Sequence, residues 1–298
     1  MNQNFMITLM HELNFPEPAQ TEFERCLSLL EAQGYTDTFD GAIEFFYEQD
    51  LDWKLTEPLL EKLSVDSQIH RYTIDILFWL ACCETLRQTF AEDEDSVFLE
   101  TMGDLYAKVM ECHEVYGIWG TFVSFWYPIF FSRDIVKLGR FEYENIIFDY
   151  DLCYEKNGIT IQKGTPVKSI HIPSHFGALT NEIRMDSYRK AYQYFADELE
   201  GKPLICICHS WLLHNSTKDI LPQNSNIVSF YHDFELIEQE DKEEFDDAWR
   251  VFGATADKQL AELPEKTSMQ KAYKQYLLSG GKTGVGLGVL IFDGEKII

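Results

Sequence analysis

Three histidines in the second half of the chain stand where they could act as bases. His171 and His175 flank the segment 172–174, and His209 follows the apolar run Leu204–Cys208. An unperturbed imidazole titrates near neutral pH, so each could take a proton from a substrate. His171 and His175 could instead each be a loop histidine bonded to backbone, and the residue types favour that interpretation for either one taken alone.

The other reactive groups nearby do not indicate a metal site, a cysteine nucleophile or a serine hydrolase. Two histidines four residues apart can bind zinc on a helix, but Pro173 and a preceding strand argue against a helix there, so no metal is predicted. Cys206 and Cys208 share one face of a strand while His209 points to the other, which predicts core thiols. No Gly-x-Ser-x-Gly pattern surrounds Ser210, so a hydrolase of that design is not predicted.

The glycine-rich segment Gly280–Gly288 resembles a nucleotide loop only superficially. A P-loop needs a glycine where this chain has Tyr276, and it needs a strand before the loop and a helix after it. Here a helix precedes and a strand follows. We expect these glycines to cap the helix and to let another backbone or a ligand approach the last strand.

The elements that position these residues form a mixed α/β region. The run Leu204–Cys208 predicts a strand buried on both faces. His209 and Ser210 at its exit are candidate ligand-facing residues, because α/β proteins bind ligands at such ends, and Trp211 is expected to be a packing residue that could form the wall of a pocket. A capping box at Thr267 and Gln270 starts a further helix. Strands are also predicted over 138–148, 158–161, 167–172, 227–237, 249–252 and 285–292, and helices over 185–199, 216–221 and up to 279.

The part before residue 134 is predicted to be all-helical. Apolar residues recur at helical spacing, and no clear strand is expected before about residue 138. Thr21 and Glu24 have the spacing of a capping box. The expected helices cover 21–34, 41–49, 58–63, 67–90 and 96–114, which predicts a helical domain over 1–133 and an α/β or α+β domain over 134–298.

Composition excludes several classes of partner. The 298 residues carry a formal net charge of −25, mostly before residue 134, which argues against binding to nucleic acid or anionic membranes. The seven scattered cysteines and the absence of a secretion signal predict reduced thiols and a cytoplasmic location. The aromatic run Tyr116–Phe131 is short for a membrane span and is expected to be a buried inter-domain element.

With these residues assembled, the chain resembles a bacterial acyltransferase-like family. Members join an N-acyltransferase N-terminal helical domain to a GNAT-like C-terminal domain. The motifs that carry the resemblance are Leu138–Tyr143, Ile170–Pro173 with Leu179-Thr180, Cys208–Leu213, Leu221–Ile227 and Val251–Gly253.

The resemblance implies an α+β protein with a central sheet in its second domain, a helical domain covering one side of it, and a substrate pocket between or beside them. The implied reaction transfers an acyl group directly from acetyl-CoA or another acyl-CoA to a small-molecule amine, without a metal. Strand 167–172, loop 173–184 and helix 185–199 would bind the coenzyme. The residues implied near it are Gly177, Ala178, Arg184, Ser210 and Trp211, and the base would be His171, His175 or His209.

Two other functions remain open. Gly177 stands without the frame of most GNAT phosphate loops, which have Gln or Arg, two residues, and then Gly-x-Gly or Gly-x-Ala. A noncatalytic ligand-binding or regulatory protein on a degenerate GNAT fold is therefore the alternative. A third hypothesis is an interaction module whose acidic helical domain binds a basic partner.

Overall fold

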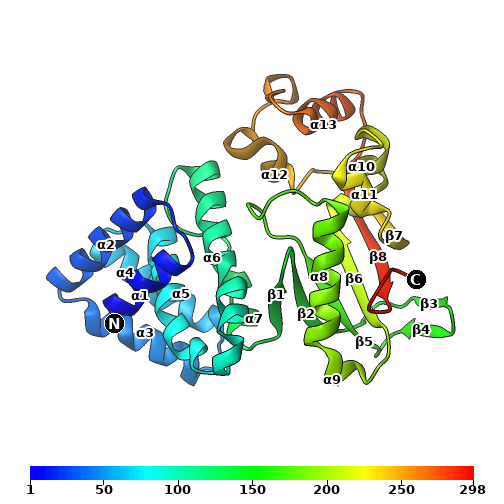
Figure 1. The fold of residues 1–298 in the computed structure, drawn as a ribbon. Coiled ribbons are helices and arrows are strands. Elements are labelled where there is room, and N and C mark those ends of the chain that lie inside the picture. Colours follow the sequence, from blue (N-terminus) through cyan, green and yellow to red (C-terminus); the bar gives the residue numbers. More distant parts are fainter. The chain divides into compact units, whose positions relative to one another are not determined.

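The computed structural model divides the chain into two compact units, Met1–Val136 and Lys137–Ile298. The structure describes residues 1–298, except for the side chain of Asp93. The first unit is helical, and the second contains the sheets (Figure 1). Among the described residues, no helix is both long and apolar enough to cross a membrane.

The first unit is built around helix α5, which is buried on nearly all sides. Trp79 lies at its centre, with ring centroids 5.0 Å from Trp53, 5.3 Å from Phe46 and 5.2 Å from Phe131. The helices are α1 (Gln3–Glu12), α2 (Glu17–Ala32), α3 (Thr36–Glu48), α4 (Trp53–Ser67), α5 (Arg71–Arg87), α6 (Asp95–Tyr116) and α7 (Pro128–Phe131). The predicted all-helical character is confirmed.

The capping box predicted at Thr21 is wrong. Helix α2 already begins at Glu17, with Pro16 as its N-cap residue, so Thr21 lies inside the helix. Proline is favoured at a helix start because its missing N–H would be unpaired there anyway, and Pro18 supplies this signal. The run 116–131 is only partly buried: Phe130 and Phe131 join the helical core, whereas Phe125 is 69% exposed.

Asp75 on α5 is a buried carboxylate in this core. Its Oδ1 accepts a hydrogen bond from Arg71, and its Oδ2 accepts one of 2.9 Å from Ser124 Oγ. Burial raises the pKa of Asp75 to about 6, although Arg71 and Ser124 act in the opposite direction. The folded protein therefore holds this proton at a pH where an unfolded chain has released it.

We expect Asp75→Asn to alter the pH dependence of stability. Between the ordinary pKa of 3.8 and the native value of about 6, the native state binds more protons than the unfolded state does. The contribution of Asp75 to the unfolding free energy therefore falls as pH rises. The amide does not titrate. The unfolding free energy of wild type relative to the variant should therefore fall by roughly 1 kcal/mol between about pH 5 and pH 7. Urea titrations check this, and a constant difference would contradict it.

The second unit contains a six-stranded sheet in the order β1-β2-β5-β6-β8-β7 and a separate β3–β4 hairpin. Strands β5 and β6 run parallel, whereas the pairs β2–β5, β6–β8 and β7–β8 are antiparallel. The strands are β1 (Ile135–Leu138), β2 (Phe141–Ile147), β3 (Cys153–Lys156), β4 (Ile159–Gln162), β5 (Pro166–His171), β6 (Leu204–Ser210), β7 (Glu235–Asp241) and β8 (Gly284–Phe292).

Helix α8 (Asn181–Tyr194) covers one face of this sheet (Figure 1). Tyr188 stacks on Phe141 of β2 at 5.5 Å and contacts Phe292 of β8 at 5.9 Å. The opposite face forms a second core, in which Ile207 and Leu287 take part. The remaining helices are α9 (Ala196–Leu199), α10 (Asn215–Ile220), α11 (Asn226–Tyr231), α12 (Ala248–Phe252) and α13 (Ser268–Leu278).

The glycine-rich segment near the C-terminus forms a helix end, a turn and strand β8, as predicted. Gly280 follows α13 with φ of +84°. A Cβ on Gly286 would lie 2.2 Å from the carbonyl oxygen of Leu213, and one on Gly284 would lie 1.9 Å from that of Glu240. Glycine is therefore required where neighbouring backbone approaches β8.

Two predicted strands are wrong. The segment 227–237 forms helix α11, which begins where Ser225 Oγ accepts hydrogen bonds from the N–H groups of Ile227 and Val228, and only then enters β7. The segment 249–252 is helix α12. The predicted capping box at Thr267 and Gln270 is confirmed at the start of α13.

Candidate active site

The parallel strands β5 and β6 separate after two residue pairs. Lys168 pairs with Cys206 and Ser169 with Ile207, and no further β5–β6 pair occurs in the described part of the chain. Strand β5 continues to His171 because it pairs with β2, and β6 continues to Ser210 because it pairs with β8. The carboxyl ends of two central strands therefore lie apart, which is where α/β proteins place ligands.

His171, at the end of β5, forms a pair with a carboxylate of β2. Its Nε2 lies 2.7 Å from Glu144 Oε2, and both side chains are half-buried. His171 lies opposite Glu142 in the ladder, so these two residues share a face of the sheet. Tyr143, the next residue of β2 after Glu142, points to the other face of the sheet, where its hydroxyl oxygen lies 3.0 Å from Ser187 Oγ of α8. His171 therefore lies on the face away from α8.

His209, near the end of β6, lies on the same face as His171. It is exposed and stands opposite Leu287, whose side chain belongs to the core on that face. The structure therefore places these two predicted bases on one face, at the ends of the two separating strands. His175 lies elsewhere, in the exposed loop after β5, with its Nδ1 2.6 Å from Ser174 Oγ.

The two cysteines of β6 are buried, as predicted. Burial raises the pKa of Cys208 to about 12 and raises that of Cys206 well above its usual range. Both thiols are therefore protonated at neutral pH, which makes them poor nucleophiles. In the described part of the chain, no group of three or more His, Cys, Asp or Glu side chains could hold a metal ion.

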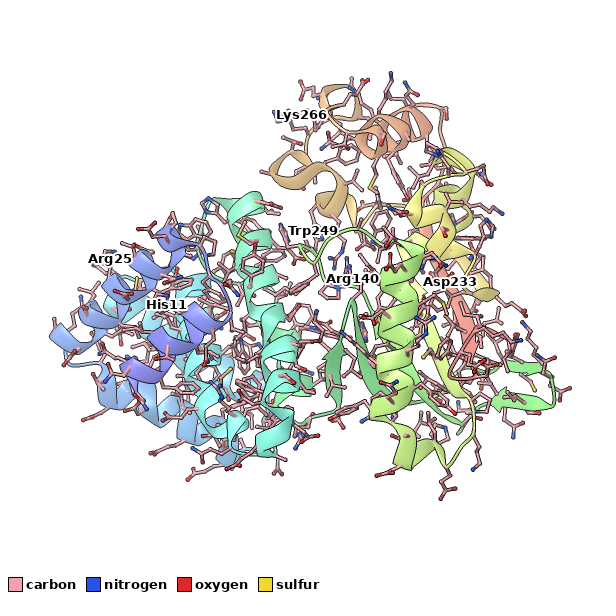
Figure 2. The ribbon with its side chains drawn as sticks, viewed as in Figure 1. His11, Arg25, Arg140, Asp233, Trp249 and Lys266 are labelled. Carbon is pink, nitrogen blue, oxygen red and sulfur yellow. The ribbon has the colours of Figure 1, made fainter. Side chains whose placement is uncertain are left out.

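The loop between β5 and α8 is held by Arg140 of the β1–β2 turn (Figure 2). Arg140 Nε donates to the Gly177 carbonyl oxygen at 3.2 Å, and Nη1 donates to that of Pro173 at 2.8 Å. The guanidinium is buried, and burial lowers its pKa while Glu142 acts in the opposite direction. Gly177 and Ala178 are exposed on this loop, beside the first turn of α8.

Arg184 is fully buried, so its position differs from that of a ligand-binding side chain. It forms a bidentate pair with Asp233, with Nε–Oδ2 of 2.6 Å and Nη2–Oδ1 of 3.0 Å, and it also donates to the carbonyl oxygen of Leu179. Asp233 also accepts from Tyr188 at 2.9 Å. This network ties the first turn of α8 to Asp233, which follows the end of α11 (Figure 2). We therefore assign Arg184 to supporting the loop.

Ser210 and Trp211 end strand β6 and begin a short 3-10 helix. Ser210 Oγ accepts from the N–H of Leu212 at 3.2 Å, which caps that helix. Trp211 packs edge-on against Phe245 at 5.8 Å and Tyr273 at 5.7 Å. Trp211 therefore serves mainly as a packing residue beside the site.

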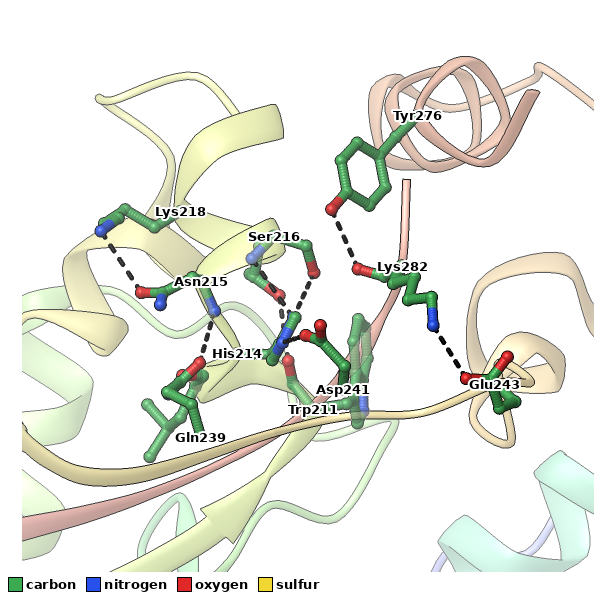
Figure 3. Close-up of polar contacts among 12 residues, drawn as sticks. Trp211, His214, Asn215, Ser216, Lys218, Gln239, Asp241, Glu243, Tyr276 and Lys282 are labelled. Atoms are coloured by element: carbon green, nitrogen blue, oxygen red, sulfur yellow. Dashed lines mark hydrogen bonds and ion pairs between the residues drawn. The ribbon is translucent and has the colours of Figure 1, made fainter. Parts of the chain in front are cut away.

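A buried histidine that the sequence analysis did not single out lies just beyond this turn (Figure 3). His214 Nδ1 accepts the N–H of Ser216 at 3.3 Å, so its proton is on Nε2, which donates to Asp241 at 3.0 Å. Gln239 supports the same junction by donating to the Leu213 carbonyl oxygen at 2.8 Å. Ser216 Oγ lies 2.8 Å from His214 Nδ1, and this buried Ser-His-Asp group links β7 to α10.

Two other residues of the site were also missed. The carboxylate partner Glu144 lies 27 positions before His171, and only the β2–β5 register brings them together. An alternating strand over 141–147 could have placed Glu142 and Glu144 on one face, but it could not identify the facing residue. Arg140 lies within a motif of the resemblance, although nothing in the sequence predicted its hydrogen bonds to the loop.

A sheet of this strand order, with its parallel strands separating beside the start of α8, defines a GNAT-like fold. The chain belongs to the family that joins an N-acyltransferase N-terminal domain, matched over residues 4–133, to a GNAT-like C-terminal domain, matched over 135–290. The fold and family expected from the sequence are thus confirmed. A search of curated proteins found no match.

The chain is similar to several solved structures of acyltransferases. One, in complex with decanoyl-CoA and teicoplanin, is 19% identical with a TM-score of 0.69, covering 96% of this chain and 87% of that chain. A mutant acyltransferase in complex with octanoyl-CoA is 18% identical with a TM-score of 0.68, covering 98% and 87%. Another, with decanoyl-CoA, is 23% identical with a TM-score of 0.66, covering 95% and 86%.

Proposed function

We propose that this protein transfers an acyl group from a coenzyme A thioester to an amine. The observation that carries the proposal is the separation of β5 and β6 after two residue pairs, next to the loop that leads into α8. Solved acyltransferases of the same fold hold acyl-CoA, which supports this choice of donor.

The coenzyme fits the residues present at the separating strands. Its pantetheine arm carries amide groups, which can pair with the edge of a strand as an added peptide strand does. The N–H groups at the start of α8, together with its dipole, favour an anion such as the pyrophosphate. Gly177 and Ala178 lie on the loop before this helix and would contact the phosphates, and backbone N–H groups at the end of β5 would stabilise the thioester oxyanion.

His171 is the base that the geometry favours. It lies at the end of β5, and Glu144 Oε2, 2.7 Å from its Nε2, orients its imidazole. In the transfer, the amine nitrogen forms a bond to the thioester carbon, the C–S bond breaks, and the amine proton passes through His171 to the leaving sulfur. His209 lies on the same face and lines the acceptor side.

Isothermal titration of the full chain with CoA, acetyl-CoA and decanoyl-CoA tests the donor. We expect saturable binding of the acyl-CoA compounds, and no heat and no thermal shift at millimolar ligand would overturn the proposal. Release of the CoA thiol in the presence of a panel of primary amines then tests the reaction. If acyl-CoA binds but no amine in the panel causes release of the CoA thiol, the noncatalytic alternative is favoured. The absence of the usual glycine pattern around Gly177 is the sequence feature that supports this alternative.

A further inference from the structure

The loop that would receive the coenzyme phosphates is fixed at two points by one buried side chain. Arg140 donates to the carbonyl oxygens of Pro173 and Gly177, which are the first and last residues of the segment 173–177. The Nζ of Lys137, on β1, lies 4.2 Å from the centre of the Phe176 ring in the same segment. Both cations come from the strand and turn that precede β2.

One residue with a side chain in this loop, His175, has a backbone conformation that costs free energy. His175 has φ of +64° and Gly177 has φ of +82°. A residue with a side chain in the left-handed region costs free energy, and it persists only where surrounding contacts fix it. A glycine-rich loop would adopt this shape with little strain, but the usual frame of glycines is missing here.

The two hydrogen bonds from Arg140 also determine the direction in which two backbone N–H groups of the loop point. No cis peptide bond is present in the described chain, and in a trans peptide unit the C=O and the next N–H point in opposite directions. Because the carbonyl oxygens of Pro173 and Gly177 point at the guanidinium, the N–H groups of Ser174 and Ala178 point away from it. Arg140 thus turns two backbone donors toward the side of the loop where an anion can bind.

We propose that Arg140 is a positioning residue that shapes the phosphate-binding loop through its backbone carbonyls, replacing the missing glycines. This inference rests on the proposed acyl-CoA function. Arg140 acts through the loop and does not touch the ligand. Arginine is suited to this role because its planar guanidinium supplies several donors in a fixed arrangement, whereas lysine has one flexible ammonium group.

The test compares two acyl donors, of which only one carries the phosphates that the loop would bind. Arg140→Lys and Arg140→Gln are titrated with decanoyl-CoA and with decanoyl-pantetheine, which lacks the nucleotide and its phosphates. We expect both variants to bind decanoyl-CoA at least tenfold more weakly, because the loop amides are no longer held in place, and to bind decanoyl-pantetheine like the wild type. Hydrogen exchange of the amides in 174–180 should become faster in both variants without ligand.

Lys274→Met provides the matched control. Lys274 is another buried cation of the second unit, and its Nζ also donates to a backbone carbonyl oxygen, that of Leu263 at 2.7 Å, but it lies on helix α13. This variant should keep the wild-type ratio of the two affinities even if its melting temperature falls. Equal weakening for both donors in the Arg140 variants, or no weakening for either, would overturn the role of Arg140. Failure of wild type to bind decanoyl-CoA would instead overturn the proposed function.

Discussion

Replacing His171 by Ala is expected to lower the turnover of amine acylation by about 100-fold or more, because the amine would lose the base that accepts its proton. The affinity for acyl-CoA should change little, since the imidazole lies on the face of the sheet away from α8, whose first turn would bind the phosphates. Thiol release with an amine that the wild type uses measures turnover, and calorimetry measures the affinity.

The other histidines supply the controls. His232→Ala removes an exposed histidine after α11 and should leave turnover unchanged. Glu144→Gln keeps the shape of the partner of His171 but removes its charge, so a smaller loss is expected, on the order of tenfold. If His209→Ala or His175→Ala lowered turnover 100-fold and His171→Ala did not, the assignment of the base would be wrong.

Gly286→Ala is expected to reduce the unfolding free energy of the second unit by about 3 kcal/mol. The added methyl would lie 2.2 Å from the Leu213 carbonyl oxygen and 2.4 Å from Gln239 Nε2, so backbone of the 3-10 turn or of β8 must move. This movement would also disturb the hydrogen bond from Gln239 to Leu213. Urea unfolding followed by far-UV circular dichroism measures the loss.

Gly41→Ala is the control for this substitution. It makes the same chemical change inside helix α3, where an added Cβ meets nothing within 4 Å. Alanine is the better helix former, so this variant should be as stable as wild type or more stable, by up to about 1 kcal/mol. A Gly286→Ala variant of wild-type stability would show that the close approach to Leu213 is relaxed in solution.

Much of the fold could be predicted because local patterns agree with burial. The apolar run 204–208 is a central strand because it is covered on both faces, and Thr267 marks a helix start through contacts within four residues. Strand β7 could not be found in this way. Its sequence, ELIEQED, is acidic and lacks a regular apolar alternation, which an edge strand tolerates because one side of it is open to water.

The site could be predicted only as single residues. His171 and His209 were candidates from their types and from the strands that carry them, but which face they share depends on strand register. Glu144 and His171 lie on paired strands that the β3–β4 hairpin separates in the sequence. Arg140 contacts Pro173 of the loop, 33 residues further along the chain. Such contacts depend on tertiary structure, which one sequence does not encode as a local pattern.

The limited pairing between β5 and β6 has a consequence for the sheet as a whole. Strands β1, β2 and β5 form one half, β6, β8 and β7 form the other, and two residue pairs join them. A ligand whose amides pair with both strand ends would complete the hydrogen bonding that the protein leaves unfinished. The substrate would then be a structural part of the sheet, and the two halves would unfold less independently when it is bound.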